Sequence, residues 1–163
     1  MNENVRQLWA PWRVGYIVGP KPTGCVFCAK ATATPADDAA NLVLARGREC
    51  FVMMNIYPYN PGHLLVLPYV HVGELEEMSE TARVELWDLV LVWKQRLQAV
   101  MHAQGFNIGV NLGHVAGAGI TEHVHVHVVP RWNGDTNFMS VVGDVRIVSQ
   151  SLQDLYEQLK DHC

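Results

Sequence analysis

Short apolar runs, rich in Val and Leu and bounded by turn residues, recur along the chain and predict five β-strands. They span residues 42–45, 51–56, 63–68, 106–112 and 124–130. The first three runs are separated by short turns, at Gly47 and at the Pro-rich residues 58–62. This spacing favours a hairpin or meander of antiparallel strands.

Two stretches have helical periodicity instead. In residues 80–103 apolar side chains recur every three or four positions, and Ser79 and Gly105 suit the two ends of a helix. Residues 151–160 repeat the pattern and predict a short C-terminal helix. Strands in runs with one long helix between them predict an α+β fold, not a doubly wound parallel sheet.

The remaining segments carry weaker patterns. Residues 1–24 contain Trp9 and Trp12, which predicts an aromatic arm packed on the body of the protein or on a neighbouring subunit. The Ala-rich residues 29–41 predict a surface loop that can include a short helical turn. The chain has 163 residues and no internal repeat, so we expect residues 1–163 to form a single domain.

Composition narrows the class of protein. Hydrophobic residues make up 49% of the chain, which excludes an intrinsically disordered protein. The net charge is −4 and no run of Lys and Arg occurs, so we expect no nucleic-acid partner. No apolar stretch is long enough for a bilayer, and no secretory signal is visible, so we expect a cytoplasmic protein with no membrane partner.

Three histidines alternate with valines between His123 and Val128. In a strand this spacing puts the three imidazoles on one face and the valines on the other, facing the core. A solvent-facing polar row is the plainer alternative. The strict period of two, and a Gly-rich loop at residues 113–119 whose amides could bind an anion, favour a functional row of histidines.

The run HVHVHVV at residues 123–129 resembles the signature of the histidine-triad (HIT) family. Asn55 and the stretch PGHLLVLP at 61–68 resemble the ribose-side strand, turn and strand of that family. Within it, LWAPWR at 8–13 and the long stretch at 107–139 are similar to bacterial diadenosine tetraphosphate phosphorylases, also called ATP adenylyltransferases. The resemblance implies a HIT-like fold with an antiparallel sheet of about five strands, one long helix and a short C-terminal helix.

The resemblance also implies a set of site residues. His125 would be the nucleophile that attacks the α-phosphorus and forms a nucleotidyl-histidine, with its other ring nitrogen donating to a fixed acceptor such as a backbone carbonyl. His127 would lie near the phosphate and leaving-group oxygens as a hydrogen-bond donor or proton source, and His63 would support the triad. The substrate-binding residues implied are Asn55, Asn111, Gly117, Ala118, Gly119 and His127.

The loop before the triad departs from the common family pattern. Many HIT proteins carry a Gln and a Ser or Thr just before the triad, whereas this chain has Ala116-Gly117-Ala118-Gly119-Ile120-Thr121-Glu122. We interpret the smaller, Gly-lined floor as room for a second anion, which a phosphorylase needs.

A structural zinc site is the expected cofactor. Cys25 and Cys28 have the spacing of half a tetrahedral zinc site. By resemblance to zinc-bearing HIT proteins, the other two ligands would be His71 and His123. The alternative is a pair of reduced thiols and two surface imidazoles. Cys50, Cys163, His102, His114 and His162 are not expected in the site, and no organic cofactor is expected.

The leading functional hypothesis is nucleotidyl transfer on dinucleoside polyphosphates, with diadenosine tetraphosphate and phosphate giving ATP and ADP. The first alternative is a HIT-type nucleotide hydrolase or phosphoramidase that uses the same covalent step. The second is a zinc-stabilised nucleotide-binding protein without significant turnover, and a catalytic metal at His125 and His127 is a further possibility. The expected partners are a nucleotide, inorganic phosphate, and other copies of the chain in a homodimer or larger assembly.

Overall fold

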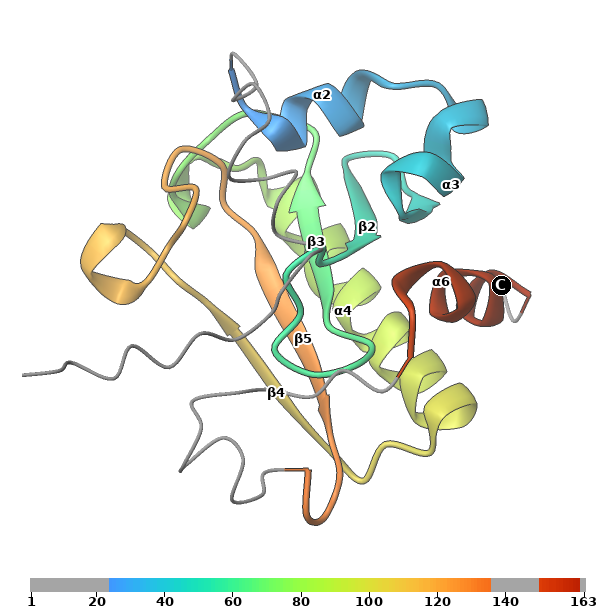
Figure 1. Cartoon of the computed structure of the whole chain (residues 1–163). Coiled ribbons are helices and arrows are strands. Elements are labelled where there is room, and N and C mark those ends of the chain that lie inside the picture. The colour runs from blue at the N-terminus through green and yellow to red at the C-terminus, as the bar shows by residue number, and fades with distance from the viewer. Residues whose placement is uncertain (1–23, 136–149, 162–163) are drawn as a thin grey trace, which may run out of the picture.

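A single five-stranded antiparallel sheet organises the protein in the computed structural model, which describes residues 24–135 and 150–161 (Figure 1). Its spatial order is β1-β2-β3-β5-β4, so β1 and β4 are the edges. The strands are β1 (Val43–Arg46), β2 (Cys50–Met54), β3 (Leu64–Pro68), β4 (Gly105–Val110) and β5 (Val126–Arg131). The predicted α+β fold with five antiparallel strands is therefore confirmed.

The long helix α4 (Glu80–Met101) packs on one face of the sheet. Its predicted N-cap is correct, because the Ser79 side chain accepts the N–H of Ala82. The predicted end at Gly105 is wrong. The helix ends at His102, which takes the left-handed conformation at φ 53°, and Gly105 is already the first residue of β4.

The predicted C-terminal helix is also present, as α6 (Leu152–Lys160). Two of its side chains attach it to the edge of the sheet. The Tyr156 hydroxyl donates to the carbonyl oxygen of Val43 at 3.1 Å, and Lys160 Nζ donates to that of Leu44 at 2.9 Å. The last helix therefore covers β1.

Most of residues 29–41 are helical, so the prediction of a surface loop there is wrong, although the short helical turn that it included is present. The segment forms α2 (Val26–Thr32), a 3₁₀ turn (Pro35–Asp37) and α3 (Asp38–Asn41). The predicted aromatic arm lies outside the described residues except for Gly24. Figure 1 shows α2 at one end of the sheet, above β3 and β5.

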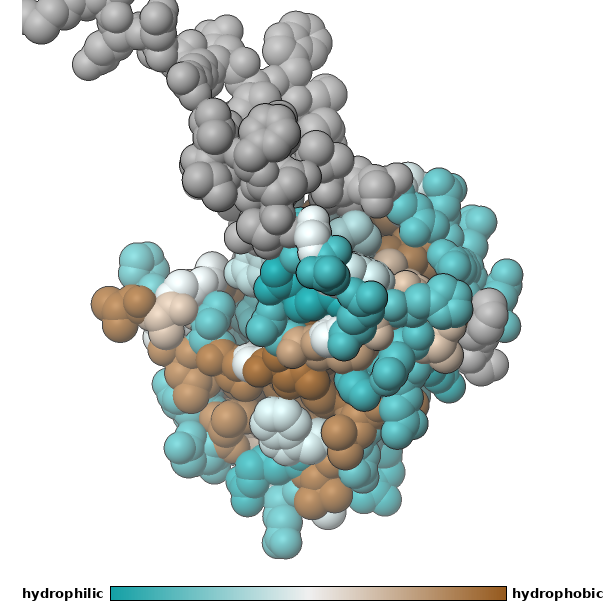
Figure 2. All heavy atoms as spheres, turned by 90° about the horizontal axis from the view of Figure 1, so that it is seen from below, coloured by the Kyte–Doolittle hydropathy of each residue, from teal (hydrophilic) through white to brown (hydrophobic). Residues whose placement is uncertain are grey.

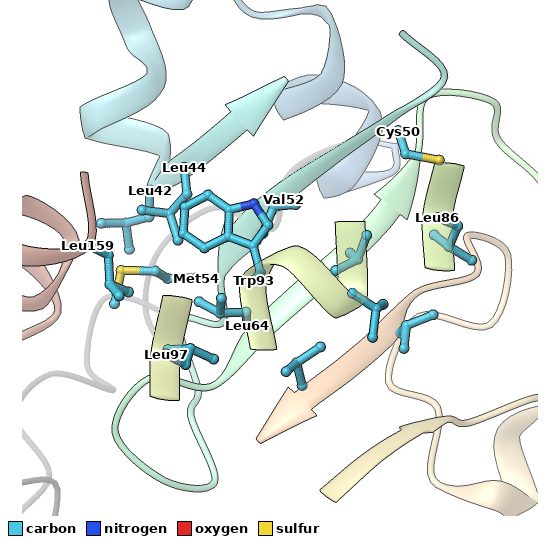
Figure 3. Close-up of a cluster of buried hydrophobic side chains, with 14 of the residues drawn as sticks. Leu42, Leu44, Cys50, Val52, Met54, Leu64, Leu86, Trp93, Leu97 and Leu159 are labelled. Carbon is cyan, nitrogen blue, oxygen red and sulfur yellow. The ribbon is translucent and has the colours of Figure 1, made fainter. Parts of the chain in front are cut away.

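Apolar side chains cover both faces of the sheet. The larger core lies under α4, where Trp93 packs among Leu44 and Val52 (Figure 3). As predicted, the valines of the histidine run face this core. On the other face, α2 adds Phe27 to a smaller cluster. That cluster contains Phe27, Val43, Phe51, Met53, Leu65 and Leu67. Among the described residues, no helix is both long and apolar enough to cross a membrane.

Candidate active site and metal cluster

Three histidines lie on the α2 side of β5 and of the residues that lead into it. His123 and His125 come just before the strand, and His127 lies within it. Phe27 of α2 is in ring contact with His123 and His125, at centroid distances of 5.5 and 5.0 Å. His123 is 0% and His125 is 7% exposed, so the alternative of a solvent-facing polar row is wrong.

The imidazole of His125 is held in one tautomer. Its Nδ1–H donates to the backbone carbonyl oxygen of His123 over 2.8 Å. Because a neutral imidazole carries one ring proton, this bond leaves Nε2 with an available lone pair. Burial lowers the pKa of His125. The ring is therefore neutral at pH 7, and its Nε2 has the form of a nucleophile.

A chain of hydrogen bonds fixes the protons of His63 and His127. The backbone N–H of Tyr59 donates to His63 Nδ1 at 3.0 Å, so the proton of neutral His63 is on Nε2. That Nε2–H donates to His127 Nδ1 at 2.9 Å. His127 must then carry its own proton on Nε2.

The Nε2 atom of His127 is buried and has no hydrogen-bond partner in the described part of the chain. Burial, and then the neighbouring His125, lower the pKa of His127 to about 4. The two rings are 4.9 Å apart between centroids. A neutral, buried N–H without a protein acceptor is suited to donate to a ligand oxygen beside the His125 nucleophile.

Asn55 joins this group through His63. Its Nδ2 lies 3.3 Å from His63 Nδ1, and its Oδ1 accepts the N–H of Tyr57 at 2.9 Å. Tyr59, which sequence reasoning treated as part of a turn, is an addition to the site. Its ring lies 4.6 Å from that of His63 and 5.8 Å from that of His127, between centroids.

The Gly-rich loop turns back on itself at Gly113 and Gly117, which have φ of 78° and 91°. The N–H of Gly117 and of Ala118 donate to carbonyl oxygens within this turn, at 3.0 and 3.4 Å. The Asn111 amide lies against the loop, with Nδ2 3.9 Å from where a Cβ on Gly117 would be. A Cβ on Gly119 would meet nothing within 4 Å, so the floor there is open.

The four predicted metal ligands converge, although they come from three distant segments. Cys25 and Cys28 lie at the start of α2, His71 follows β3, and His123 precedes β5. Their ligand atoms all lie within 4.8 Å of one another. Cys28 Sγ is 3.3 Å from His71 Nδ1, and the two imidazole Nδ1 atoms are 3.4 Å apart.

Four of the separations, between 3.3 and 3.5 Å, fit a tetrahedral metal ion. Ligand atoms about 2.0–2.3 Å from a central zinc lie roughly 3.3–3.8 Å from one another. The imidazole of His123 is also correctly oriented, because its Nε2–H donates to the carbonyl oxygen of Pro68 at 2.9 Å and leaves Nδ1 for the metal. The cluster can therefore hold a metal.

A hollow of about 670 Å³ lies beside the cluster. Three of the ligand residues and the loop before the triad line it. The lining residues are Gly24, Cys25, Val26, Cys28, His71, Gly119, Ile120, Thr121 and Glu122. Gly119 and the metal ligands thus share one hollow, and His63, His125 and His127 are not among the residues that line it.

Comparisons with known proteins agree with this geometry. The HIT domain family matches residues 37–134. The AP-4-A phosphorylase of Mycobacterium tuberculosis is 39% identical over 93% of this chain and 81% of that protein. The asymmetrical bis(5'-nucleosyl)-tetraphosphatase of Schizosaccharomyces pombe is 33% identical over 57% of this chain and 50% of that protein.

A solved structure agrees as well. A Zn-bound histidine triad family protein from Mycobacterium smegmatis superposes with a TM-score of 0.67 and 26% identity, over 85% of this chain and 91% of that one. The family match covers more than half of the chain and contains His63 and all three histidines of the run. The chain therefore belongs to the HIT domain family.

Proposed function

We propose that the protein is a nucleotidyltransferase that converts diadenosine tetraphosphate and inorganic phosphate to ATP and ADP through a nucleotidyl-histidine at His125. The observation that carries this proposal is the 2.8 Å bond from His125 Nδ1–H to the His123 carbonyl, which leaves Nε2 as a nucleophile. The identity of 39% with an AP-4-A phosphorylase supports the choice of reaction.

In the first step His125 Nε2 attacks an α-phosphorus, and a nitrogen–phosphorus bond forms. The bond from that phosphorus to its bridging oxygen breaks, and ATP leaves. His127 Nε2–H donates to the phosphate oxygens, since it is neutral and has no acceptor in the described residues. Its pKa of about 4 keeps the ring neutral at pH 7, so His127 stabilises the charge that develops on the leaving oxygen by donating a hydrogen bond, and ATP leaves as an anion.

In the second step an oxygen of inorganic phosphate attacks the same phosphorus. The nitrogen–phosphorus bond breaks, ADP leaves and His125 regains its lone pair. Water in place of phosphate would give AMP. Gly119 is exposed and a Cβ there would meet nothing within 4 Å, so this position of the loop presents no steric obstacle to a second anion.

Other residues of the chain would bind the nucleotide. We propose that Asn55 binds the ribose hydroxyls, and that Asn111 and the loop at Gly117, Ala118 and Gly119 contact the phosphates. The Asn55 amide is already tied to His63, which holds it beside the triad. The amides of Gly117 and Ala118 are engaged within their turn, so contact through them requires the loop to change conformation on binding.

We propose zinc as the ion held by Cys25, Cys28, His71 and His123. Two thiolates and two imidazoles in a tetrahedron are a typical donor set for zinc. The metal would cross-link α2 to the ends of two strands and would stay outside the chemical steps. Cysteines that hold a metal as thiolates must stay reduced, so we propose that the protein works in the cytoplasm. We also propose that the chain forms a single domain.

We also propose that two or more copies of the chain associate. The face of α4 turned away from the sheet carries Val84, Trp87 and Leu91, which are 57%, 44% and 57% exposed. Figure 2 shows a surface on which apolar side chains form a patch surrounded by hydrophilic ones. Exposed apolar surface of this kind favours a protein partner.

Product analysis tests the proposed reaction. The protein is incubated with diadenosine tetraphosphate, with and without inorganic phosphate, and the nucleotides are separated by chromatography. We expect ATP and ADP, and only when phosphate is present. AMP and ATP formed without phosphate would instead identify the hydrolase.

The variant His125→Asn separates an enzyme from a nucleotide-binding protein. Asn keeps a side-chain N–H for the His123 carbonyl but has no nucleophilic ring nitrogen, so we expect turnover to fall by about 10³-fold or more while nucleotide binding persists. His102→Asn is the matched control, because His102 is exposed at the end of α4 and lies in a conformation that Asn tolerates. Full turnover in His125→Asn would contradict the covalent mechanism.

A further inference from the structure

Helix α2 joins the metal cluster to the candidate nucleophile. Phe27 lies between Cys25 and Cys28 in the sequence, and its side chain is 6% exposed. Its ring is 5.0 Å from that of His125 and 5.5 Å from that of His123, between centroids. One buried aromatic side chain therefore touches both a metal ligand and the nucleophile.

The helix that carries Phe27 is attached at both ends. At its start, Cys25 and Cys28 belong to the metal cluster. At its end, the Arg46 guanidinium donates to the carbonyl oxygens of Lys30 and Ala31, at 3.0 and 3.1 Å. A helix of only seven residues has little stability of its own, so these two attachments hold Phe27 in place.

The nucleophile needs such a contact. The bond from Nδ1 to the His123 carbonyl fixes one edge of the His125 ring, but the ring can still rotate about its side-chain torsions. The His127 ring meets it edge-on at 4.9 Å, and the Phe27 ring lies 5.0 Å away at an interplanar angle of 58°. Contacts with both rings restrict the direction of the Nε2 lone pair.

We propose that Phe27 is a positioning residue for His125, pressed against it by a helix that the bound metal holds in place. Metal loading then affects the reaction through the orientation of the nucleophile. His123 contributes twice, because its side chain is a metal ligand and its carbonyl accepts the His125 proton. This inference rests on the proposed function, in which His125 is the nucleophile.

The test uses the full-length, metal-loaded protein with Phe27→Leu, which removes the ring and keeps an apolar side chain. Metal content is measured first, and we expect it to equal that of the wild type. NMR of ¹⁵N-labelled histidine then reports the tautomer and the line width of His125. We expect a single sharp Nδ1–H form in the wild type, and exchange-broadened resonances with a mixture of tautomers in Phe27→Leu.

The kinetic readout is made on the same samples. For diadenosine tetraphosphate and phosphate we expect kcat to fall on the order of ten-fold in Phe27→Leu, with KM changed less than about two-fold, because orientation and not binding is lost. Phe51→Leu is the matched control. Phe51 is fully buried in the same apolar cluster but stacks on Tyr69, so its loss should lower Tm and leave the His125 resonances unchanged.

Chelation of the wild-type protein is the second arm. We expect His125 to broaden in the metal-free protein while the amides of β2 and β3 keep their shifts. Unchanged His125 resonances after metal removal, or in Phe27→Leu, would overturn the inference. A wild type without turnover would disprove the proposed function alone, because the NMR result is independent of activity.

Discussion

At the scale of single residues, the site depends on where three neutral imidazoles carry their protons. The N–H of Tyr59 sets the tautomer of His63, which in turn sets that of His127. A backbone carbonyl does the same for His125. The alternation of His and Val was enough to predict a shared face, and the resemblance implied the partnership of His63. Tyr59 was not predictable, because its contribution is a backbone amide placed by a turn.

The lowered pKa of His127 predicts how the stability of the protein depends on pH. Its pKa is about 4 in the folded protein, against an ordinary value of 6.5. Between these values the unfolded chain binds a proton that the folded protein does not, so the free energy of unfolding falls as the pH drops from about 6.5 to about 4, by at most about 1.4 kcal/mol per pH unit. Urea unfolding of His127→Gln should therefore give a flatter profile than the wild type over this range.

The comparison needs a control, because other groups titrate in the same window. His114→Gln removes an exposed histidine of the loop and serves as the comparison for loss of a histidine outside the buried row. Parallel curves for the wild type and His127→Gln would show that the His127 ring is protonated alike in the folded and unfolded states.

At the scale of secondary-structure elements, hydrophobic patterning predicted the helices and strands whose side chains are buried at regular positions. Both faces of β2 and β3 are buried, so these strands are continuous apolar runs, and α4 has its buried stripe at helical spacing. Residues 26–41 lack such a pattern, since Phe27 is the one buried residue of α2. The helical conformation of α2 depends on contacts with side chains that are distant in the sequence, above all Arg46. The sequence of α2 alone does not reveal these contacts.

Arg46 supplies a stability prediction for this region. Its guanidinium donates to Asp38 at 2.8 Å and to two carbonyl oxygens of α2, and both charged side chains are mostly buried. Arg46→Met leaves the carboxylate and the carbonyls without their donor, so we expect a loss of about 2–3 kcal/mol in the free energy of unfolding. Arg48→Met is the control. That side chain is 78% exposed, and we expect a change within about 0.5 kcal/mol.

The loop before the triad gives a prediction about the acceptor. Because a Cβ on Gly119 meets nothing within 4 Å, Gly119→Gln can place its amide in the open floor without a clash. If phosphate binds there, KM for phosphate should rise about ten-fold or more, whereas Gly119→Ala should change it little. Steady-state kinetics with phosphate varied at saturating dinucleotide measure this, and an unchanged KM in Gly119→Gln would place phosphate elsewhere.

At the scale of the whole molecule, the metal cluster ties α2 to the end of β3 and the approach to β5. The spacing of Cys25 and Cys28 predicted them as metal ligands. His71 and His123, however, are 43 and 95 residues from Cys28 in the sequence. Only the resemblance to zinc-bearing relatives pointed to those two. The fold brings them together because β3 and β5 are hydrogen-bonded neighbours in the sheet.

The last prediction concerns the outer face of α4. Its buried residues follow one helical stripe, but Val84, Trp87 and Leu91 form a second stripe three and four positions apart. The periodicity of residues 80–103 did not reveal this second stripe. Since a helix that is apolar on two faces is normally covered on both, a second copy of the chain should bury it. Sedimentation equilibrium of the wild type should show an assembly, and Leu91→Glu should shift it to monomers at micromolar concentration. Ala36→Glu adds the same charge at an exposed position of the 3₁₀ turn Pro35–Asp37, on another element, and should leave the assembly intact; a monomeric wild type would rule the interface out.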